Sequence, residues 1–265
     1  MFNRRLGACL ALVTLLVITG PAYAQTDRQP LWAQVEAPLA EDNPALITIA
    51  QAGTAEPPAL QCKDPSSSML WKVEGNDRDV YLFGSIHVGK ADFYPLHDDI
   101  EQAFREAEHL VFEVDPQSAS DTSVVLQMQS RGMLPAGQTL SDVVSGEVLQ
   151  QLRVVLAELG MPEAGFMTMR PWFLTLVLSS FQMAMSGFEP RYGIENYLAS
   201  RQTPDMEILE LESIGEQISF LEELNAESFL AYTLEGFDEG QEEIESLISA
   251  WRCADKETLF NTLFS

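Results

Sequence analysis

The segment Val80–His87 reads VYLFGSIH, and it predicts a strand that ends just before a histidine. Its first four residues are apolar or aromatic, which is typical of a buried strand, and a Gly-Ser-Ile run then leads to the histidine. A second apolar run, Leu70–Val73, precedes it across residues 74–77, whose Gly75 and Asn76 suit a tight turn. We therefore expect a β-hairpin, with His87 just beyond its second strand.

A helix and another strand are predicted after His87. The apolar positions of residues 98–109 recur at i, i+3, i+4 and i+7, which places them on one helical face. Asp98 or Asp99 is expected to cap this helix, and His97 and His109 are expected at its surface. Leu110–Val114 then reads as a strand, so residues 80–114 form a candidate βαβ unit.

The rest of the chain is predicted to be largely helical. Residues 145–160 form an amphipathic helix with serine at its start and glycine at its end. Residues 171–187 form a very apolar helix that is too short to cross a bilayer, and we expect it to be buried. A strand at 208–211 and a helix opened by the capping box of Ser213 and Glu216 follow.

The N-terminus has the pattern of a secretory signal. Arg4 and Arg5 precede an apolar run, and Ala22-Tyr23-Ala24 fits a small-x-small cleavage site. We expect cleavage after Ala24 and an exported protein, periplasmic or secreted, with an uncleaved anchor as the alternative. Residues 25–68 read as a flexible linker rich in proline and alanine, and residues 69–265 as the folded domain. Export permits a disulfide between Cys62 and Cys253, and two free thiols are the alternative.

Composition narrows the class of protein further. The 265 residues include 40 acidic and 15 basic side chains, for a formal charge of −25. Such a surface repels nucleic acids and anionic membranes. At 46% hydrophobic residues, the chain has enough apolar material for a core, which excludes general disorder.

Three polar residues stand where candidate strands end, which is where α/β proteins gather reactive groups. His87 follows strand 80–83, Glu113 lies within strand 110–114, and Glu212 ends strand 208–211. A carboxylate in a buried strand is costly unless it is paired or binds a metal, and His with Glu suits a divalent ion. The alternatives are a structural histidine, an outward-facing Glu113, and a Glu212 that serves a helix N-terminus.

Taken together, these segments resemble the TraB/GumN family, which is related to the Tiki proteases. The resemblance extends over residues 69–225, and its motifs are LWKV (70–73), VYLFGSIHVG (80–89), YPL (94–96), FEVD (112–115), RPW (170–172), YGIE (192–195) and LES (211–213) with Gln217. It implies an α+β fold of two βα-type halves, with small mixed sheets surrounded by helices. It also implies a metal-dependent hydrolase or peptidase that acts on a peptide or protein substrate.

The resemblance also suggests roles for individual residues. His87 would bind a divalent metal ion of the Mn, Co or Zn class, and Glu113 would bind it or act as general base. Glu195 and Glu212 would be further carboxylates of the pocket, and Arg170 would stabilise an oxyanion or hold a carboxylate.

One departure from the family pattern bears on activity. The family has a second G-x-x-H motif near its C-terminus, and this sequence contains only the one at Gly84–His87. The pattern therefore predicts a shortened family member with an incomplete C-terminal part, weak metal retention and negligible peptidase activity. The alternative is a non-catalytic binding or remnant domain of the cell envelope.

Overall fold

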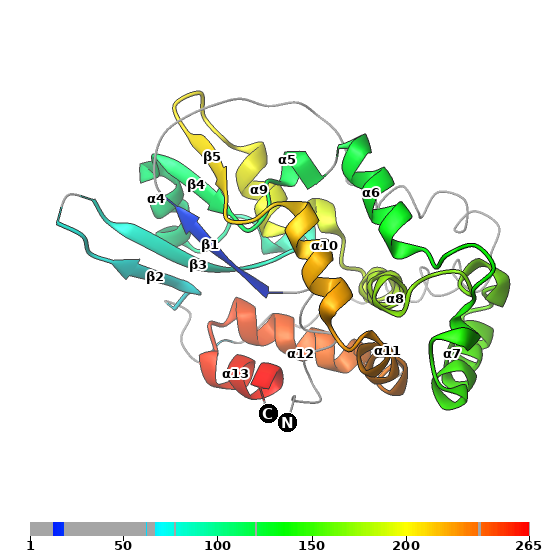
Figure 1. Cartoon of the computed structure of the whole chain (residues 1–265). Coiled ribbons are helices and arrows are strands. Elements are labelled where there is room, and N and C mark those ends of the chain that lie inside the picture. Colours follow the sequence, from blue (N-terminus) through cyan, green and yellow to red (C-terminus); the bar gives the residue numbers. More distant parts are fainter. Residues whose placement is uncertain are drawn as a thin grey trace.

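The computed structural model describes residues 13–18, 62, 67–76, 78–119, 121–237 and 240–264. The predicted cleavage site after Ala24 lies outside these residues, as does the predicted linker apart from residues 62, 67 and 68. The structure is a mixed α+β arrangement that is mostly helical (Figure 1). None of the helices in the described part of the chain is long and apolar enough to cross a membrane.

Five strands form one mixed sheet in the order β2-β3-β1-β4-β5. The strands are β1 (Val13–Ile18), β2 (Leu70–Val73), β3 (Val80–Ile86), β4 (His109–Phe112) and β5 (Glu207–Glu210). The predicted hairpin is confirmed, since β2 pairs antiparallel with β3 from Leu70↔Phe83 to Val73↔Val80. β4 and β5 pair in parallel.

The centre of the sheet is occupied by β1, which comes from the predicted secretory signal. β1 runs antiparallel to β3 on one side and to β4 on the other (Figure 1). β3 and β4 are therefore parallel to each other but are not neighbours. The predicted strand–helix–strand unit is present, and the sheet inserts one more strand inside it.

The helices surround the sheet and extend away from it. Around the sheet lie α4 (Asp98–Glu106), α5 (Pro116–Ala119), α9 (Ile194–Ser200), α12 (Gly240–Arg252) and α13 (Lys256–Phe264). The others are α6 (Thr122–Gly132), α7 (Gly146–Glu158), α8 (Pro171–Met185), α10 (Ile214–Glu223) and α11 (Ala226–Glu235). The described residues also form the 3₁₀ turns η1 (Ala91–Phe93), η2 (Leu140–Asp142), η3 (Glu163–Gly165) and η4 (Pro190–Tyr192).

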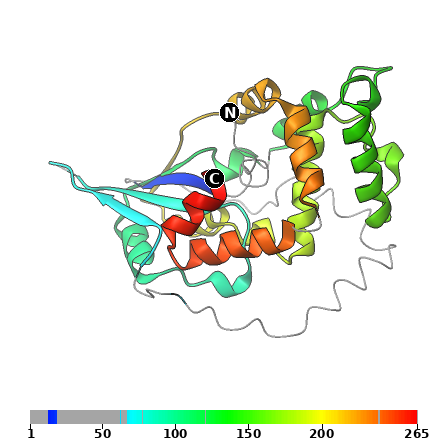
Figure 2. The ribbon, with the colours of Figure 1, turned by 90° about the horizontal axis from the view of Figure 1, so that it is seen from below.

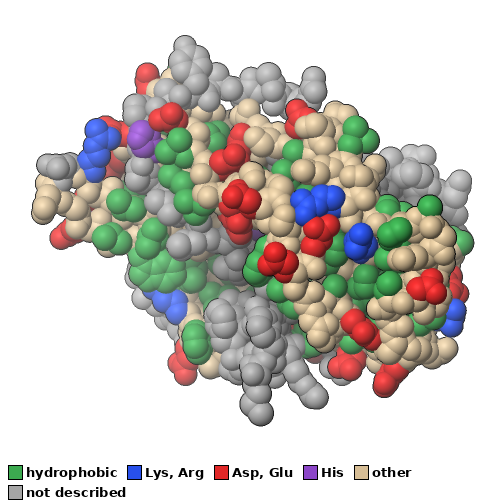
Figure 3. Space-filling view, viewed as in Figure 1, with side chains coloured by type: hydrophobic (Ala, Val, Ile, Leu, Met, Phe, Trp, Pro, Cys, Tyr) green, Lys and Arg blue, Asp and Glu red, His purple; other side chains and the backbone are tan. Residues whose placement is uncertain are grey.

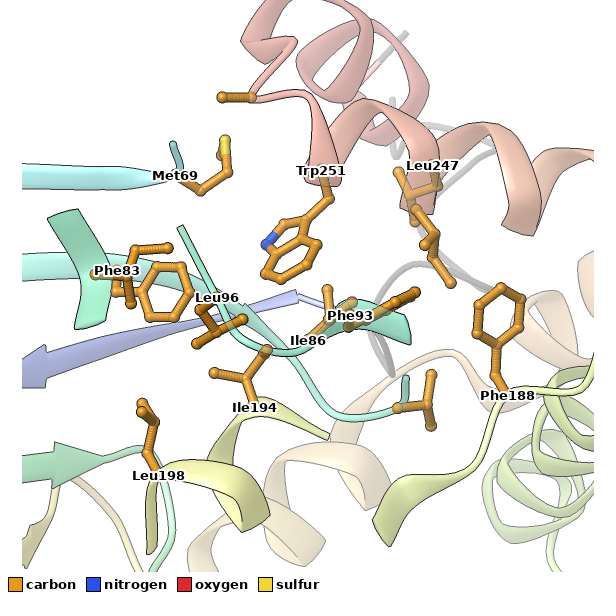
Figure 4. Close-up of a cluster of buried hydrophobic side chains, with 14 of the residues drawn as sticks. Met69, Phe83, Ile86, Phe93, Leu96, Phe188, Ile194, Leu198, Leu247 and Trp251 are labelled. Carbon is orange, nitrogen blue, oxygen red and sulfur yellow. The ribbon is translucent and has the colours of Figure 1, made fainter. Parts of the chain in front are cut away.

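The main hydrophobic core lies between the sheet and the helices packed on it. Trp251 and Leu247 of α12 point toward Phe83, Ile86 and the η1 side chain Phe93 (Figure 4). Trp251 also donates a hydrogen bond from Nε1 to the carbonyl oxygen of Gly84, at 2.6 Å. This contact anchors β3 to α12, the orange-red helix that lies beside the strands in Figure 2.

A second core holds the helical part together. It is built from leucines of α7, α8 and α11, with Leu152, Leu174, Leu178 and Leu230 fully buried. The apolar helix predicted at 171–187 is the centre of this core, and it begins at Pro171 and ends before Gly187, whose φ is +74°. The predicted caps at Ser145 and at Ser213 with Glu216 are also confirmed.

The cap of α4 was predicted wrongly. Asp98 is the first helical residue and His97 is the N-cap, because Asp98 and Asp99 place their negative charges within the first turn, where the helix dipole favours them. His97 and His109 are half-buried, with 33% and 25% of their side chains exposed. Their Nδ1 atoms lie 2.7 Å from Asp99 and 3.5 Å from Glu207, respectively.

Two strands also end earlier than their apolar runs suggest. β4 stops at Phe112, because Pro116 begins α5 only a few residues later, and Glu113 therefore lies in a bend after the strand. β5 stops at Glu210, because the chain turns into the Ser213 cap. The first change moves Glu113 from a strand into a loop, and the second places Glu212 two residues beyond its strand.

The disulfide left open by the sequence is formed between Cys62 and Cys253. It ties the segment before β2 to the end of α12. On the face shown in Figure 3, acidic side chains are spread over much of the surface with few lysines or arginines among them. This distribution agrees with the formal charge of −25.

Candidate functional site

The candidate site lies at one edge of the sheet. β3, β4 and β5 run in the same direction, so their carboxyl ends meet at that edge. His87 is the first residue after β3, Glu113 is the first after β4, and Glu212 follows β5 by two residues. The backbone N–H of Glu212 donates to the carbonyl oxygen of Glu113 at 3.1 Å, which holds these two loops together.

His87 is paired with Glu195, the second residue of α9. The Nδ1 atom of His87 lies 3.4 Å from Oε1 of Glu195, and the two side chains are 38% and 13% exposed. The fully buried Ser85 donates from Oγ to the same carboxylate oxygen at 2.6 Å. Ser85, His87 and Glu195 thus form one hydrogen-bonded cluster between β3 and α9.

The electrostatics of this pair favour the charged forms of both partners. Burial alone would lower the pKa of His87, but the negative charge of Glu195, its hydrogen bond to His87 and the charge of Glu113 together outweigh burial and raise that pKa above 6.5. Burial alone would raise the pKa of Glu195, and the charge of His87 with the hydrogen bonds from His87 and Ser85 lowers it to about 2. At neutral pH the pair therefore contains a carboxylate and a histidine that keeps its proton more readily than usual.

Backbone packing brings α9 against His87. A side-chain carbon added to Gly193, the N-cap of α9, would lie only 2.2 Å from the carbonyl oxygen of His87. Gly89 and Glu189 exchange two backbone hydrogen bonds of 3.0 and 2.9 Å just beside this contact. The hydroxyl of Tyr94 donates to the carbonyl oxygen of Tyr192 at 2.6 Å. The turn before α9 is thus fastened to the loop after β3.

Glu113 has an unusual environment for a carboxylate. It is half-buried, and its Oε2 atom is buried without a hydrogen-bond partner. Burial raises the pKa of Glu113, while the positive charge of His87 and a hydrogen bond from Gln217 of α10 act in the opposite direction. The nearby carboxylate of Glu212 raises the pKa further, and the net shift is upward.

Arg170 is held at the start of α8 by contacts other than those of His87 and Glu113. It is the N-cap of α8, and its Nε donates to the carbonyl oxygen of Met133 at 3.2 Å. Its positive charge contributes to lowering the pKa of Glu222 in α10. The interactions of the described residues thus join His87, Glu195, Glu113 and Glu212, and none of them links Arg170 to His87.

The described side chains around His87 offer few free donors for a metal ion. Among the described residues, no group of three or more His, Cys, Asp or Glu side chains is arranged to hold a metal ion. The unpartnered Oε2 of Glu113 is a suitable oxygen donor, but Oε1 of Glu195 is already bonded to Ser85 and faces His87. Because catalytic metal sites use about three protein ligands, the described side chains do not form a full coordination shell.

Ser85, Gln217 and Gly193 were not assigned roles from the sequence. Ser85 and Gly193 both act where the end of β3 contacts the start of α9, about 110 residues later in the chain. A contact between such distant segments leaves no local sequence pattern. The available signal was the glycine before Ile194-Glu195, since glycine often marks a close backbone approach. Gln217 lies one turn into α10, on the side that reaches Glu113.

Comparison with known proteins gives a family and several distant relatives. The model of the TraB/PrgY/gumN family matches residues 69–264. The chain is 32% identical over 153 residues to the uncharacterized protein YbaP of Escherichia coli (strain K12), covering 57% of this chain and 54% of YbaP. It is 32% identical over 117 residues to the metalloprotease TIKI1 of Danio rerio, covering 42% of this chain and 22% of TIKI1.

An uncharacterized protein of Treponema pallidum (strain Nichols) is 29% identical over 157 residues, covering 58% of this chain and 46% of that protein. The chain therefore spans about half the length of the curated bacterial relatives that it matches. No solved structure matches it.

Proposed function

Since the chain belongs to the TraB/PrgY/gumN family, we propose that it is an exported hydrolase whose chemistry centres on His87, Glu195 and Glu113. The observation that carries the proposal is the buried, unpartnered Oε2 of Glu113 at the same sheet edge as His87. A buried carboxylate oxygen without a partner is costly, and such groups are retained where a ligand or a reacting molecule supplies the partner.

The two groups are suited to complementary roles. Glu113, whose pKa is raised, would take a proton from the water that attacks a carbonyl carbon. His87 keeps its proton because Glu195 faces it, so it would donate to the leaving group or to the developing oxyanion. Ser85 would hold Glu195 in place. With 38% of its side chain exposed, His87 is open to a substrate.

A peptide is the proposed substrate class, because one relative is named as a metalloprotease. A divalent ion of the Mn, Co or Zn class held by His87 and Glu113 is the alternative to these acid and base roles, because a metal-binding imidazole must be neutral. The described side chains do not complete the coordination shell of such an ion. No step of the chemistry described above is routed through that ion.

The test is hydrolysis of a defined peptide mixture, followed by mass spectrometry, with EDTA or with added Mn²⁺, Co²⁺ or Zn²⁺. We expect His87→Ala and Glu113→Gln to reduce cleavage by about 100-fold or more, as loss of a general acid or base does. His109→Gln is the matched control, because His109 begins β4 at the end opposite Glu113. Equal cleavage by wild type and His87→Ala would overturn the proposal, and so would no cleavage by either, which the missing second G-x-x-H motif predicts.

A further inference from the structure

The strand β1 fills the space between β3 and β4. It belongs to the predicted secretory signal, which cleavage after Ala24 would remove. β1 spans Val13–Ile18, and each of its residues pairs with a residue of β3, from Val13↔Ile86 to Ile18↔Tyr81. Its last two residues, Val17 and Ile18, also pair with Val111 and Leu110 of β4. Cleavage after Ala24 would take this central strand away and leave β3 and β4 unpaired along the edges that face each other.

Both neighbouring strands are deeply buried. Phe83 and Ser85 of β3 are fully buried, as are Leu110 and Phe112 of β4. Backbone N–H and C=O groups that are buried without partners cost free energy, and the great majority in folded proteins are paired. An empty space between these strands is therefore unfavourable.

Other contacts keep β3 and β4 from simply closing together. Two strands that flank a third lie about 9.5 Å apart, and direct pairing would halve that distance. β3 is held by Trp251 through the Gly84 carbonyl oxygen and by Glu195 through Ser85. β4 is held by its parallel partner β5 along its whole length. Closing the space would require these contacts to break or the two halves of the sheet to move.

We propose that the space between β3 and β4 is a docking site for an extended, uncharged, apolar peptide strand. β1 itself displays the chemistry that fits: the six residues VTLLVI carry no charge and run antiparallel to both neighbours. After export, a polypeptide segment of the same kind completes the sheet by strand addition. This inference rests on the sheet and not on the proposed hydrolase activity.

The docked strand also sets the geometry of the candidate site. Its first residue pairs with Ile86, which directly precedes His87, so the N-terminal end of the strand points to the site edge. His87 follows one flanking strand and Glu113 follows the other. The occupant therefore fixes the positions of the two strands that carry these groups.

The experiment compares two forms of the whole protein. One is the natural exported product, and the other carries Ala22→Leu and Ala24→Leu, which remove the small residues required for cleavage and keep β1 in the chain. The probe is a labelled synthetic peptide of residues 10–19 with lysines added at both ends for solubility. The control peptide has Leu16→Pro, which removes a backbone donor and disfavours strand pairing.

We expect the exported product to bind the probe about tenfold or more tightly than the proline peptide, and the uncleaved form to bind neither. In hydrogen exchange, the probe should protect amides of β3 and β4 in the exported product. If that product does not fold alone, adding the probe during refolding should recover folded protein, and the proline peptide should not.

Several results would overturn the proposal. The first two are equal binding of both peptides and binding of the probe by the uncleaved form. The next two are protected β3 and β4 amides in an exported product that binds no probe, and refolding that neither peptide improves. The last is a natural product that still contains residues 1–24. None of these measurements depends on peptide cleavage, so the hydrolase proposal is judged separately.

Discussion

Single residues set the distances between the segments of the candidate site, and Gly193 is the clearest example. Its φ is −67°, an ordinary value, so glycine is required there by crowding and not by backbone conformation. The crowding atom is the carbonyl oxygen of His87, a backbone atom that cannot rotate away. Gly193 therefore sets the distance between α9, with its Glu195, and the loop that carries His87.

The substitution Gly193→Ala should push α9 and His87 apart. We expect a loss of about 1–3 kcal/mol in the free energy of unfolding, the usual cost of overpacking, measured by urea denaturation. Gly146→Ala is the control, since an added carbon there meets nothing within 4 Å. Equal stability of the Gly193→Ala variant and the wild type would show that the close approach is not a constraint.

At the scale of elements, α4 and α9 are joined by an ion pair. Glu101 accepts hydrogen bonds from Arg201 at 3.0 Å and from the hydroxyl of Tyr197 at 2.7 Å. Burial alone would raise the pKa of Glu101, but the bonds from Arg201 and Tyr197 outweigh burial and lower it. A carboxylate with a lowered folded pKa stabilises the fold above its unfolded pKa, about 4.5, and loses that contribution as pH falls.

Glu101→Gln should therefore destabilise the protein at pH 7 by about 1–3 kcal/mol. This is less than a fully buried pair would cost, because Arg201 is 36% exposed and screened by solvent. The stability difference from wild type should shrink as pH falls below about 4.5. Urea denaturation between pH 3 and 7 measures it, with Glu106→Gln on the same helix as control. A pH-independent difference would contradict the assignment to charge.

The elements themselves were largely predictable, and their arrangement was not. The hairpin at 70–86, the helix at 171–185 and the capping box at Ser213 follow from local periodicity and cap chemistry. Placing β1 at the centre of the sheet depends on long-range pairing, and its apolar sequence fits a secretory signal equally well.

The candidate site was predictable to a similar degree. His87, Glu113 and Glu212 could be proposed because strand ends are visible as limits of apolar runs, although two of those limits were placed too late. The pairing of His87 with Glu195 through Ser85 comes from tertiary contacts that leave no spacing signal.

At the scale of the whole molecule, the disulfide joins distant parts of the chain. Cys62 and Cys253 are 191 residues apart, so their bond fastens the segment before β2 to α12 and shortens the unfolded chain greatly. Replacing both with serine should cost about 2–5 kcal/mol of unfolding free energy. Denaturation with and without a reducing agent measures this loss. The reducing agent should have no effect on the double variant, and a wild type insensitive to it would contradict a stabilising role.

The central claim is that His87, Glu195 and Glu113 act on one another at a single sheet edge. Its most direct test is the pH titration of His87 by NMR, which is tractable because the chain has only three histidines. We predict a pKa for His87 above 6.5 in the wild type, a large decrease in Glu195→Gln, a smaller decrease in Glu113→Gln, and no change in Glu106→Gln. A His87 pKa that responds to neither Glu195 nor Glu113 would contradict the site.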